Sequence, residues 1–276
     1  MSEAASNNGG LTMSTQHTEG QRQKYDRAFL LSDGKRNQLM ELWEVQQFGI
    51  DSFADPAYVC IYGMPPTEWY RRGIRLLART TLEAVRDKLG DLIGQDVARV
   101  LHNAPPTTTF TVIDPFAGSC NGLYWLVRHV QNSQGLGFEV DNTIFDLTTR
   151  NLHLAALERP IELIHGDYRS LLATRRWPAD QFIVAFLAPP WGDALSATTG
   201  LDLGRTKPPL TEIIEDFERA YTDNRILYVT QVHQHLEPVS LATLKQRFEW
   251  SDLRIYDINV EGMKHGILLG TKRWTP

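Results

Sequence analysis

Short apolar runs and amphipathic segments alternate along the chain from residue 108 onward. Four runs predict strands because they are short and apolar, with β-branched or aromatic residues: residues 110–113, 135–141, 161–165 and 182–187. Two segments between them predict helices, at 123–130 and 142–157. The run 182–187 is continuously apolar, as expected of a strand buried on both faces. Strands that alternate with helices are typical of an α/β fold with a mostly parallel sheet.

The C-terminal third continues this pattern. Residues 194–209 are rich in Gly, Pro and Thr and predict a loop, and residues 211–221 predict a helix. Three more strands are expected, at 225–230, 253–258 and 266–271.

The N-terminal third has helical spacing instead. Residues 25–48 predict one or two helices, and residues 67–92 predict the strongest helix, because apolar side chains recur there every three or four positions. Thr67 is its expected N-cap. We therefore divide the chain into three parts: a disordered tail at 1–20, a helical region at 21–104, and an α/β domain at 105–276.

The segment from Asp114 to Gly122 lies between the first predicted strand and a helix. Gly118 and Gly122 allow a sharp turn and a close approach to a ligand. The glycine spacing is not that of a dinucleotide-binding loop. An acid at the strand end is a poor neighbour for phosphate and a good one for an ammonium group. The loop therefore favours a ligand with a nucleoside and an amine, and S-adenosylmethionine (SAM) is the candidate.

Acidic residues follow the next two strands. Glu139 comes 25 residues after Asp114, near the spacing at which doubly wound folds place a carboxylate on ribose hydroxyls. Asp141 is expected to cap the following helix. Asp167 could accept from the adenine amino group, and Tyr168 could pack on the adenine ring. Because ligands of open α/β sheets bind outside the carboxyl ends of the strands, these side chains should converge.

The fourth strand is followed by Ala188-Pro189-Pro190-Trp191-Gly192. Proline fixes the backbone and has no N–H, so the carbonyl groups here stay free to accept from an amine. Trp191 could stack on a flat or cationic group. The simpler alternative is that the prolines end the strand and Trp191 covers the core.

These four motifs together resemble those of class I SAM-dependent methyltransferases. Within that superfamily they are most similar to the trimethylguanosine-synthase group, which methylates guanine N2 of RNA caps. The resemblance covers residues 108–274 and implies a Rossmann-like sheet, mostly parallel with the last strand antiparallel. The helical N-terminal region is expected to lie as a lid over the carboxyl ends of these strands and to exclude water. The resemblance also implies Asp114 and Gly118 near the methionine part of SAM, Glu139 on the ribose, Asp167 near the adenine, and Trp191 on the methyl acceptor.

The expected site follows from the motifs and the resemblance together. SAM, as co-substrate, is expected to contact ten residues: Asp114, Pro115, Phe116, Ala117, Gly118, Asn121, Glu139, Asp167, Tyr168 and Ala188. The expected catalytic residues are Pro189, Pro190 and Trp191. No metal is expected, because the pair His233 and His235 has no third ligand at a convincing spacing. His165 and His265 are possible general bases.

One departure from the family concerns the acceptor. Relatives that methylate amines have Asn, Asp or Ser before the two prolines, whereas this chain has Ala188. Three functions therefore stay open. The first is methyl transfer to a nitrogen or oxygen of a small molecule, and the second is methylation of guanine N2 in RNA. The third uses SAM alone, forming azetidine-2-carboxylate and methylthioadenosine.

Composition narrows these possibilities. The net charge of −5 and the pI of about 5.9 disfavour a protein that grips a phosphate backbone. Two cysteines are too few for a disulfide framework. No apolar stretch has the length of a membrane span, and the N-terminus lacks the pattern of a secretion signal. We expect a cytoplasmic enzyme with a small-molecule substrate and no membrane partner.

Overall fold

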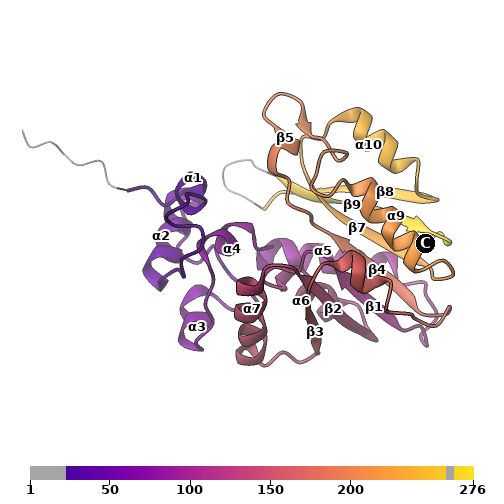
Figure 1. Ribbon diagram of the computed structural model, residues 1–276, viewed down its shortest axis with the longest axis horizontal. Coiled ribbons are helices and arrows are strands. Elements are labelled where there is room, and N and C mark those ends of the chain that lie inside the picture. Colours follow the sequence, from indigo (N-terminus) through magenta and orange to yellow (C-terminus); the bar gives the residue numbers. More distant parts are fainter. Residues whose placement is uncertain (1–22, 259–263) are drawn as a thin grey trace, which may run out of the picture.

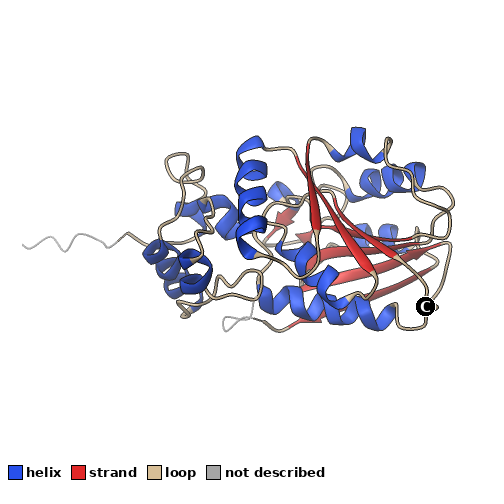
Figure 2. Cartoon of the chain, turned by 90° about the horizontal axis from the view of Figure 1, so that it is seen from below, coloured by secondary structure: helices blue, strands red, loops and turns tan. Residues whose placement is uncertain are grey.

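The computed structural model of the chain describes residues 23–258 and 264–276, and its centre is a twisted sheet (Figures 1 and 2). Within these residues seven strands form the sheet in the order β3-β2-β1-β4-β7-β9-β8. The strands are β1 (Phe110–Asp114), β2 (Ser133–Glu139), β3 (Ile161–His165), β4 (Phe182–Leu187), β7 (Ile226–His233), β8 (Trp250–Tyr256) and β9 (His265–Lys272). The neighbours up to β7 pair in parallel, and β9 runs antiparallel between β7 and β8. The predicted α/β fold with an antiparallel last strand is confirmed.

Helices cover both faces of the sheet because its central strands are apolar on both sides. Along β4, Val184 and Phe186 pack with α5 (Asp87–Val100) and α6 (Asn121–His129). The alternate residues pack with helices on the other face, which are α8 (Tyr168–Leu172), α9 (Leu210–Ala220) and α10 (Pro238–Lys245). Helix α7 (Asn142–Ala155) connects β2 to β3, and Asp141 caps it as predicted, accepting from two N–H groups. A short hairpin of β5 (Leu195–Ser196) and β6 (Gly200–Leu201) follows β4.

The predicted helix at 67–92 is wrong. This segment forms α3 (Pro66–Arg71), α4 (Ala78–Glu83) and the start of α5. Gly73 breaks the pattern with φ +88°, and residues 74–77 are not helical; there Met40 N–H donates to the carbonyl of Leu76 and Leu77 is extended. The apolar spacing suggested a single helix, but the apolar side chains of this segment belong to two separate clusters. One cluster lies among the N-terminal helices and the other lies against the sheet.

The N-terminal helices form their own layer at the end of the sheet to which β1 and β2 point (Figure 1). Helices α1 (Arg27–Leu30), α2 (Leu42–Phe53), α3 and α4 surround a buried cluster that contains Trp69. Among the aromatic residues there, Trp69 is fully buried and Trp43 is 59% exposed. The tail predicted at 1–20 lies outside the described residues.

Helices α5 and α6 approach each other closely because glycines face the contact. A Cβ on Gly90 would lie 2.5 Å from Cδ1 of Trp125. A Cβ on Gly94 would lie 2.5 Å from Cδ2 of His129 and 2.8 Å from the carbonyl oxygen of Trp125. Trp125 Nε1 also donates to Asp87 at 2.7 Å, which fixes the start of α5 against α6. The glycines thus hold the first turn of α5 beside the loop that follows β1.

We predict that Gly94→Ala lowers the free energy of unfolding by about 1–3 kcal/mol, because the added methyl group meets backbone that cannot move aside. The gain in helix propensity, about 1 kcal/mol, offsets only part of this cost. Urea unfolding measures the change. Gly34→Ala is the control, since an added Cβ there has no atom within 4 Å. Equal unfolding midpoints for the two variants would contradict the close packing.

Candidate functional site

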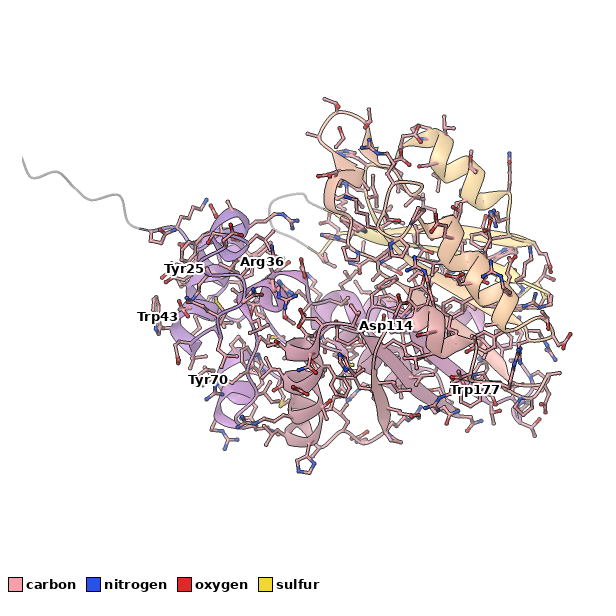
Figure 3. All side chains as sticks on the ribbon, viewed as in Figure 1. Tyr25, Arg36, Trp43, Tyr70, Asp114 and Trp177 are labelled. Atoms are coloured by element: carbon pink, nitrogen blue, oxygen red, sulfur yellow. The ribbon has the colours of Figure 1, made fainter. Side chains whose placement is uncertain are left out.

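The parallel strands bring three predicted site segments to one edge of the sheet. Strand β1 lies between β2 and β4, so Asp114 and Glu139, which end β1 and β2, and Ala188, which follows β4, are at neighbouring strand ends. The connection after β1 leads to β2 on one side, and the connection after β4 leads to β7 on the other side. Open α/β sheets bind ligands between two strands whose connections diverge in this way. Asp114 lies near the centre of the molecule (Figure 3).

Asp114 is a buried carboxyl at the end of β1. It is 2% exposed, and it accepts one backbone hydrogen bond, from Phe116 N–H at 2.9 Å. Burial raises the pKa of Asp114 to about 7, the Phe116 bond lowers it, and nearby Glu139 raises it further. No basic side chain of the described residues forms an ion pair with it. The site therefore offers a cationic group a carboxyl that water does not reach.

Glu139 ties the end of β2 to the loop after β1. One of its oxygens accepts from Gly118 N–H at 3.0 Å, and the other accepts from Asp141 N–H at 2.8 Å. Gly118 has φ +50°, a conformation that glycine adopts without strain. Its carbonyl accepts from the hydroxyl of Thr148 at 2.7 Å. Burial raises the pKa of Glu139 as well. The carboxylate predicted for the ribose is thus fixed beside the predicted SAM loop.

The rest of the loop packs tightly on the sheet. A Cβ on Gly122 would lie 2.6 Å from the Phe186 ring, and one on Gly137 would lie 2.8 Å from Cβ of Ala117. Cys120 is fully buried, and burial raises its pKa, so it is not a thiolate near neutral pH.

Asn121 joins the loop to the N-terminal region. Its Oδ1 accepts from Tyr62 N–H at 2.7 Å. Its Nδ2 donates to the Val85 carbonyl at 2.6 Å and to Asp87 at 2.9 Å. The Tyr62 hydroxyl donates to the carbonyl of Ser119. These bonds hold the N-terminal segment against the loop and occupy the Asn121 amide, whose predicted contact with SAM stays a prediction.

A further contact to the N-terminal region lies at the end of β2. Arg79 of α4 donates to Asp141 at 2.6 Å. Contacts of this kind could not be found from the sequence, because their partners are tens of residues apart.

Asp167 and Tyr168 lie where β3 ends. Asp167 caps α8 by accepting from Arg169 N–H at 2.9 Å, and its carboxylate is half exposed. Tyr168 is buried, with its hydroxyl donating to Asp216 at 3.1 Å and its ring edge against Phe116. Phe116 is only partly buried. Of the two aromatic rings at the loop, Phe116 is therefore the one open to a ligand.

Trp191 packs against two histidines, His233 at the end of β7 and His265 at the start of β9. Its ring stacks on His265, with centroids 5.8 Å apart and planes 21° apart, and meets His233 edge to face at 6.1 Å. Pro189 is buried and Pro190 is exposed, so the two prolines bring the chain from the core to the surface just before Trp191. Of the two possible general bases, only His265 lies beside Trp191. His165 stacks on Phe145, away from this group.

The two histidines beside Trp191 are uncharged near neutral pH. Burial lowers the pKa of His265 to about 4, and neighbouring His233 and Arg86 lower it too. Burial also lowers the pKa of His233. Nδ1 of His233 accepts from His235 N–H at 3.1 Å, so the proton of its neutral ring lies on Nε2. Trp191 is therefore flanked by two histidine rings that are aromatic and polar but uncharged.

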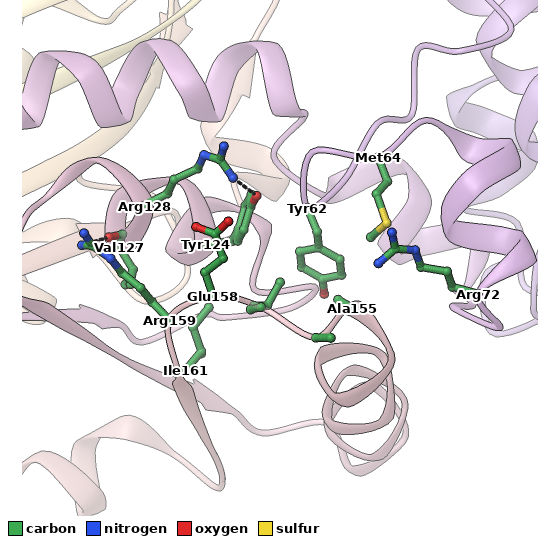
Figure 4. Close-up of a pocket in the computed structure, with 12 residues that line it drawn as sticks. Tyr62, Met64, Arg72, Tyr124, Val127, Arg128, Ala155, Glu158, Arg159 and Ile161 are labelled. Carbon is green, nitrogen blue, oxygen red and sulfur yellow. Dashed lines mark hydrogen bonds between the residues drawn. The ribbon is translucent and has the colours of Figure 1, made fainter.

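A cavity of about 230 Å³ lies elsewhere, between α6, the end of α7 and the segment before α3 (Figure 4). Its three arginines are already engaged: Arg128 donates to the Tyr124 hydroxyl, Arg159 donates to two backbone carbonyls, and Arg72 pairs with Glu68. None of the predicted site residues lines it, and Tyr62, whose hydroxyl donates to the Ser119 carbonyl, connects it to the loop. We do not assign the chemistry to this cavity.

Within residues 23–258 and 264–276, no group of three or more His, Cys, Asp or Glu side chains is arranged to hold a metal ion. No helix in this part of the chain is long and apolar enough to cross a bilayer.

Comparisons with known proteins bear on the fold. No family model and no curated protein matches the chain. Among solved structures, a METTL16 methyltransferase domain aligns with a TM-score of 0.50 at 16% identity, covering 69% of this chain and 70% of that one. A methyltransferase from Geobacter sulfurreducens aligns with a TM-score of 0.44 at 15% identity, covering 69% and 80%. The N-terminal domain of human METTL16 in complex with SAH gives 0.44 at 18% identity, covering 64% and 66%. The chain has the class I methyltransferase fold.

We predict that Asp114→Asn stabilises the ligand-free protein at pH 8. The pKa of Asp114 in the folded state, about 7, lies above the value of about 3.9 in an unfolded chain. Ionisation therefore costs folding free energy, which grows between about pH 4 and 7 and is complete above that range. The gain on substitution is at most about 4 kcal/mol.

Thermal unfolding of the ligand-free variant at pH 5 and pH 8 tests this prediction. The gain in melting temperature over the unsubstituted protein should be larger at pH 8. Asp180→Asn, at an exposed position, is the control and should change neither melting temperature by more than a degree or so. A loss of stability at pH 8 in Asp114→Asn would show that the carboxylate is compensated in the folded protein.

Proposed function

We propose that this protein is an enzyme that binds SAM at the carboxyl ends of β1, β2 and β4 and transfers its methyl group to a nitrogen or oxygen of a small molecule. The observation that carries the proposal is the buried, unpaired carboxyl of Asp114 beside the loop that Glu139 holds. The class I methyltransferase fold supports it. The methionine ammonium would lie at Asp114, the ribose at Glu139, and the adenine between Phe116 and Asp167.

The expected chemistry is direct displacement. The sulfonium makes the methyl carbon electrophilic, so the protein must mainly hold the nucleophile in line with the carbon–sulfur bond. Trp191 supports this task as a flat surface for the acceptor. The neutral rings of His233 and His265 can exchange hydrogen bonds with an amine or hydroxyl without repelling a cation. The nucleophile forms a bond to the methyl carbon, S-adenosylhomocysteine leaves, and the proton of the nucleophile passes to water.

The likeness to the trimethylguanosine-synthase group would instead favour RNA as the acceptor. Two observations weigh against it. Ala188 offers no side-chain oxygen to a guanine amine, and the net charge of −5 disfavours a polyanion. In addition, the bonds from Asn121 to Val85 and Asp87 draw the N-terminal segment toward the loop, which favours a small ligand.

A second candidate function follows from two of these three features: the missing side-chain acceptor at Ala188, and the N-terminal segment held close to the loop. In this second reaction, SAM is the only substrate. The α-amine of the methionine part, once deprotonated, attacks its own γ-carbon. The bond from that carbon to sulfur breaks, methylthioadenosine leaves, azetidine-2-carboxylate forms, and the ammonium proton goes to solvent.

Incubation of the protein with SAM, followed by mass analysis of products, distinguishes these functions. The proposal predicts S-adenosylhomocysteine only after a mixture of small metabolites is added. Methylthioadenosine and azetidine-2-carboxylate from SAM alone, above the rate of spontaneous breakdown, would select the second candidate. S-adenosylhomocysteine formed only with capped RNA would restore the RNA function. Asp114→Asn serves as the control and should lose turnover of SAM in every case.

A further inference from the structure

Arg86 is a buried cation in the short connection between α4 and α5. It is 8% exposed. One terminal nitrogen donates to the Ala84 carbonyl and the other donates to the Leu82 carbonyl at 3.0 Å. Its Nε is buried and has no partner. Within the part of the chain that the structure describes, no carboxylate forms an ion pair with the guanidinium.

A buried charge without an ion pair is costly, and the nearby Asp87 carboxylate offsets that cost only by attraction at a distance. Burial lowers its pKa, but a guanidinium stays charged near neutral pH. The nearest acid in sequence, Asp87, does not pair with it. The Asp87 carboxylate accepts instead from Trp125, Asn121 and Gly63 N–H, and burial raises its pKa. The ring of Tyr58 lies 5.4 Å from the guanidinium carbon and offsets a further part of the cost.

Arg86 lies close to the loop that is proposed to bind SAM. The residues on both sides of it, Val85 and Asp87, accept from the Asn121 side chain, and Asn121 begins α6 directly after the loop. The charge of Arg86 also lowers the pKa of His265, whose ring stacks on Trp191, a residue shortly after β4. Arg86 therefore lies beside the start of α6, where the loop after β1 ends, and near His265 at the start of β9.

We propose that Arg86 binds a carboxylate, and that this carboxylate is the one on the methionine part of SAM. The proposal rests on the proposed binding of SAM at these strand ends. Arg86 has N–H groups left to donate, and a guanidinium with a carboxylate forms strong, charge-assisted hydrogen bonds. The ammonium and the carboxylate of a methionine share one carbon atom. Asp114 and Arg86 then neutralise the two ends of the same zwitterion.

The test compares ligands that differ in this one group. SAM has the carboxylate, decarboxylated SAM lacks only the carboxylate, and methylthioadenosine lacks the whole amino-acid part. Calorimetry measures the dissociation constant of each ligand with the unsubstituted protein and with Arg86→Met. The substitution should weaken SAM by roughly 10- to 100-fold, the usual range for hydrogen bonds to charged groups. Decarboxylated SAM and methylthioadenosine should change by less than about threefold.

Two further variants separate binding from folding. Arg75→Met is matched to Arg86→Met, because Arg75 also donates to two backbone carbonyls and lies over a tyrosine ring. It should lose comparable stability without distinguishing SAM from decarboxylated SAM. Arg86→Lys keeps the charge and should recover part of the affinity for SAM. If Arg86→Met does not fold, the comparison of the three ligands is made with Arg86→Lys, which should weaken only SAM.

Three results would overturn the inference. Equal weakening of SAM and decarboxylated SAM in Arg86→Met would make Arg86 a structural residue. Unchanged affinity for SAM, combined with a raised KM for an acceptor that carries a carboxylate, would assign the arginine to the acceptor instead. Absence of binding of any of the three ligands to the unsubstituted protein would remove the proposed function itself, together with this inference.

Discussion

Two ionisable groups of opposite sign, Asp114 and Arg86, are buried near the loop that follows β1, and neither forms an ion pair within the described residues. Asp114 ends β1 with one backbone hydrogen bond, and Arg86 has an unpartnered Nε at the junction of α4 and α5. Removing an unpaired charge from water costs several kcal/mol. A ligand that supplies the counter-charges would offset this cost. A zwitterionic amino-acid group has both charges required, and SAM carries one next to its reactive sulfonium.

The N-terminal region is part of this arrangement. Asn121 binds Tyr62 on one side and the Val85–Asp87 turn on the other, so the loop that follows β1 and the segment that carries Arg86 are fixed together. Gly90 and Gly94 let α5 lie directly on α6 and keep this turn in place. The class I sheet thus supplies Asp114 and Glu139, and the N-terminal addition supplies Arg86. On the proposed account, the binding of SAM thus depends in part on a residue outside the common fold.

The sequence predicted the elements whose causes are local. Strand β4, the Asp141 cap and the loop from Asp114 follow from apolar runs, a helix-start signal and glycines, and the structure has each of them. The helix at 67–92 was wrong because spacing alone cannot tell one helix from two short helices joined by extended residues. Arg86 and the partners of Asn121 could not be predicted, because burial and hydrogen bonds across tens of residues are products of the tertiary fold.

Titration of the ligand-free protein with S-adenosylhomocysteine at pH 7, in two buffers of different ionisation enthalpy, tests the central claim most directly. The account predicts binding in the range usual for enzyme substrates, roughly 1 μM to 1 mM. It also predicts net proton release, because the ammonium group shifts a half-protonated Asp114 to its ionised form. No heat of binding in either buffer, or binding with proton uptake, would contradict it.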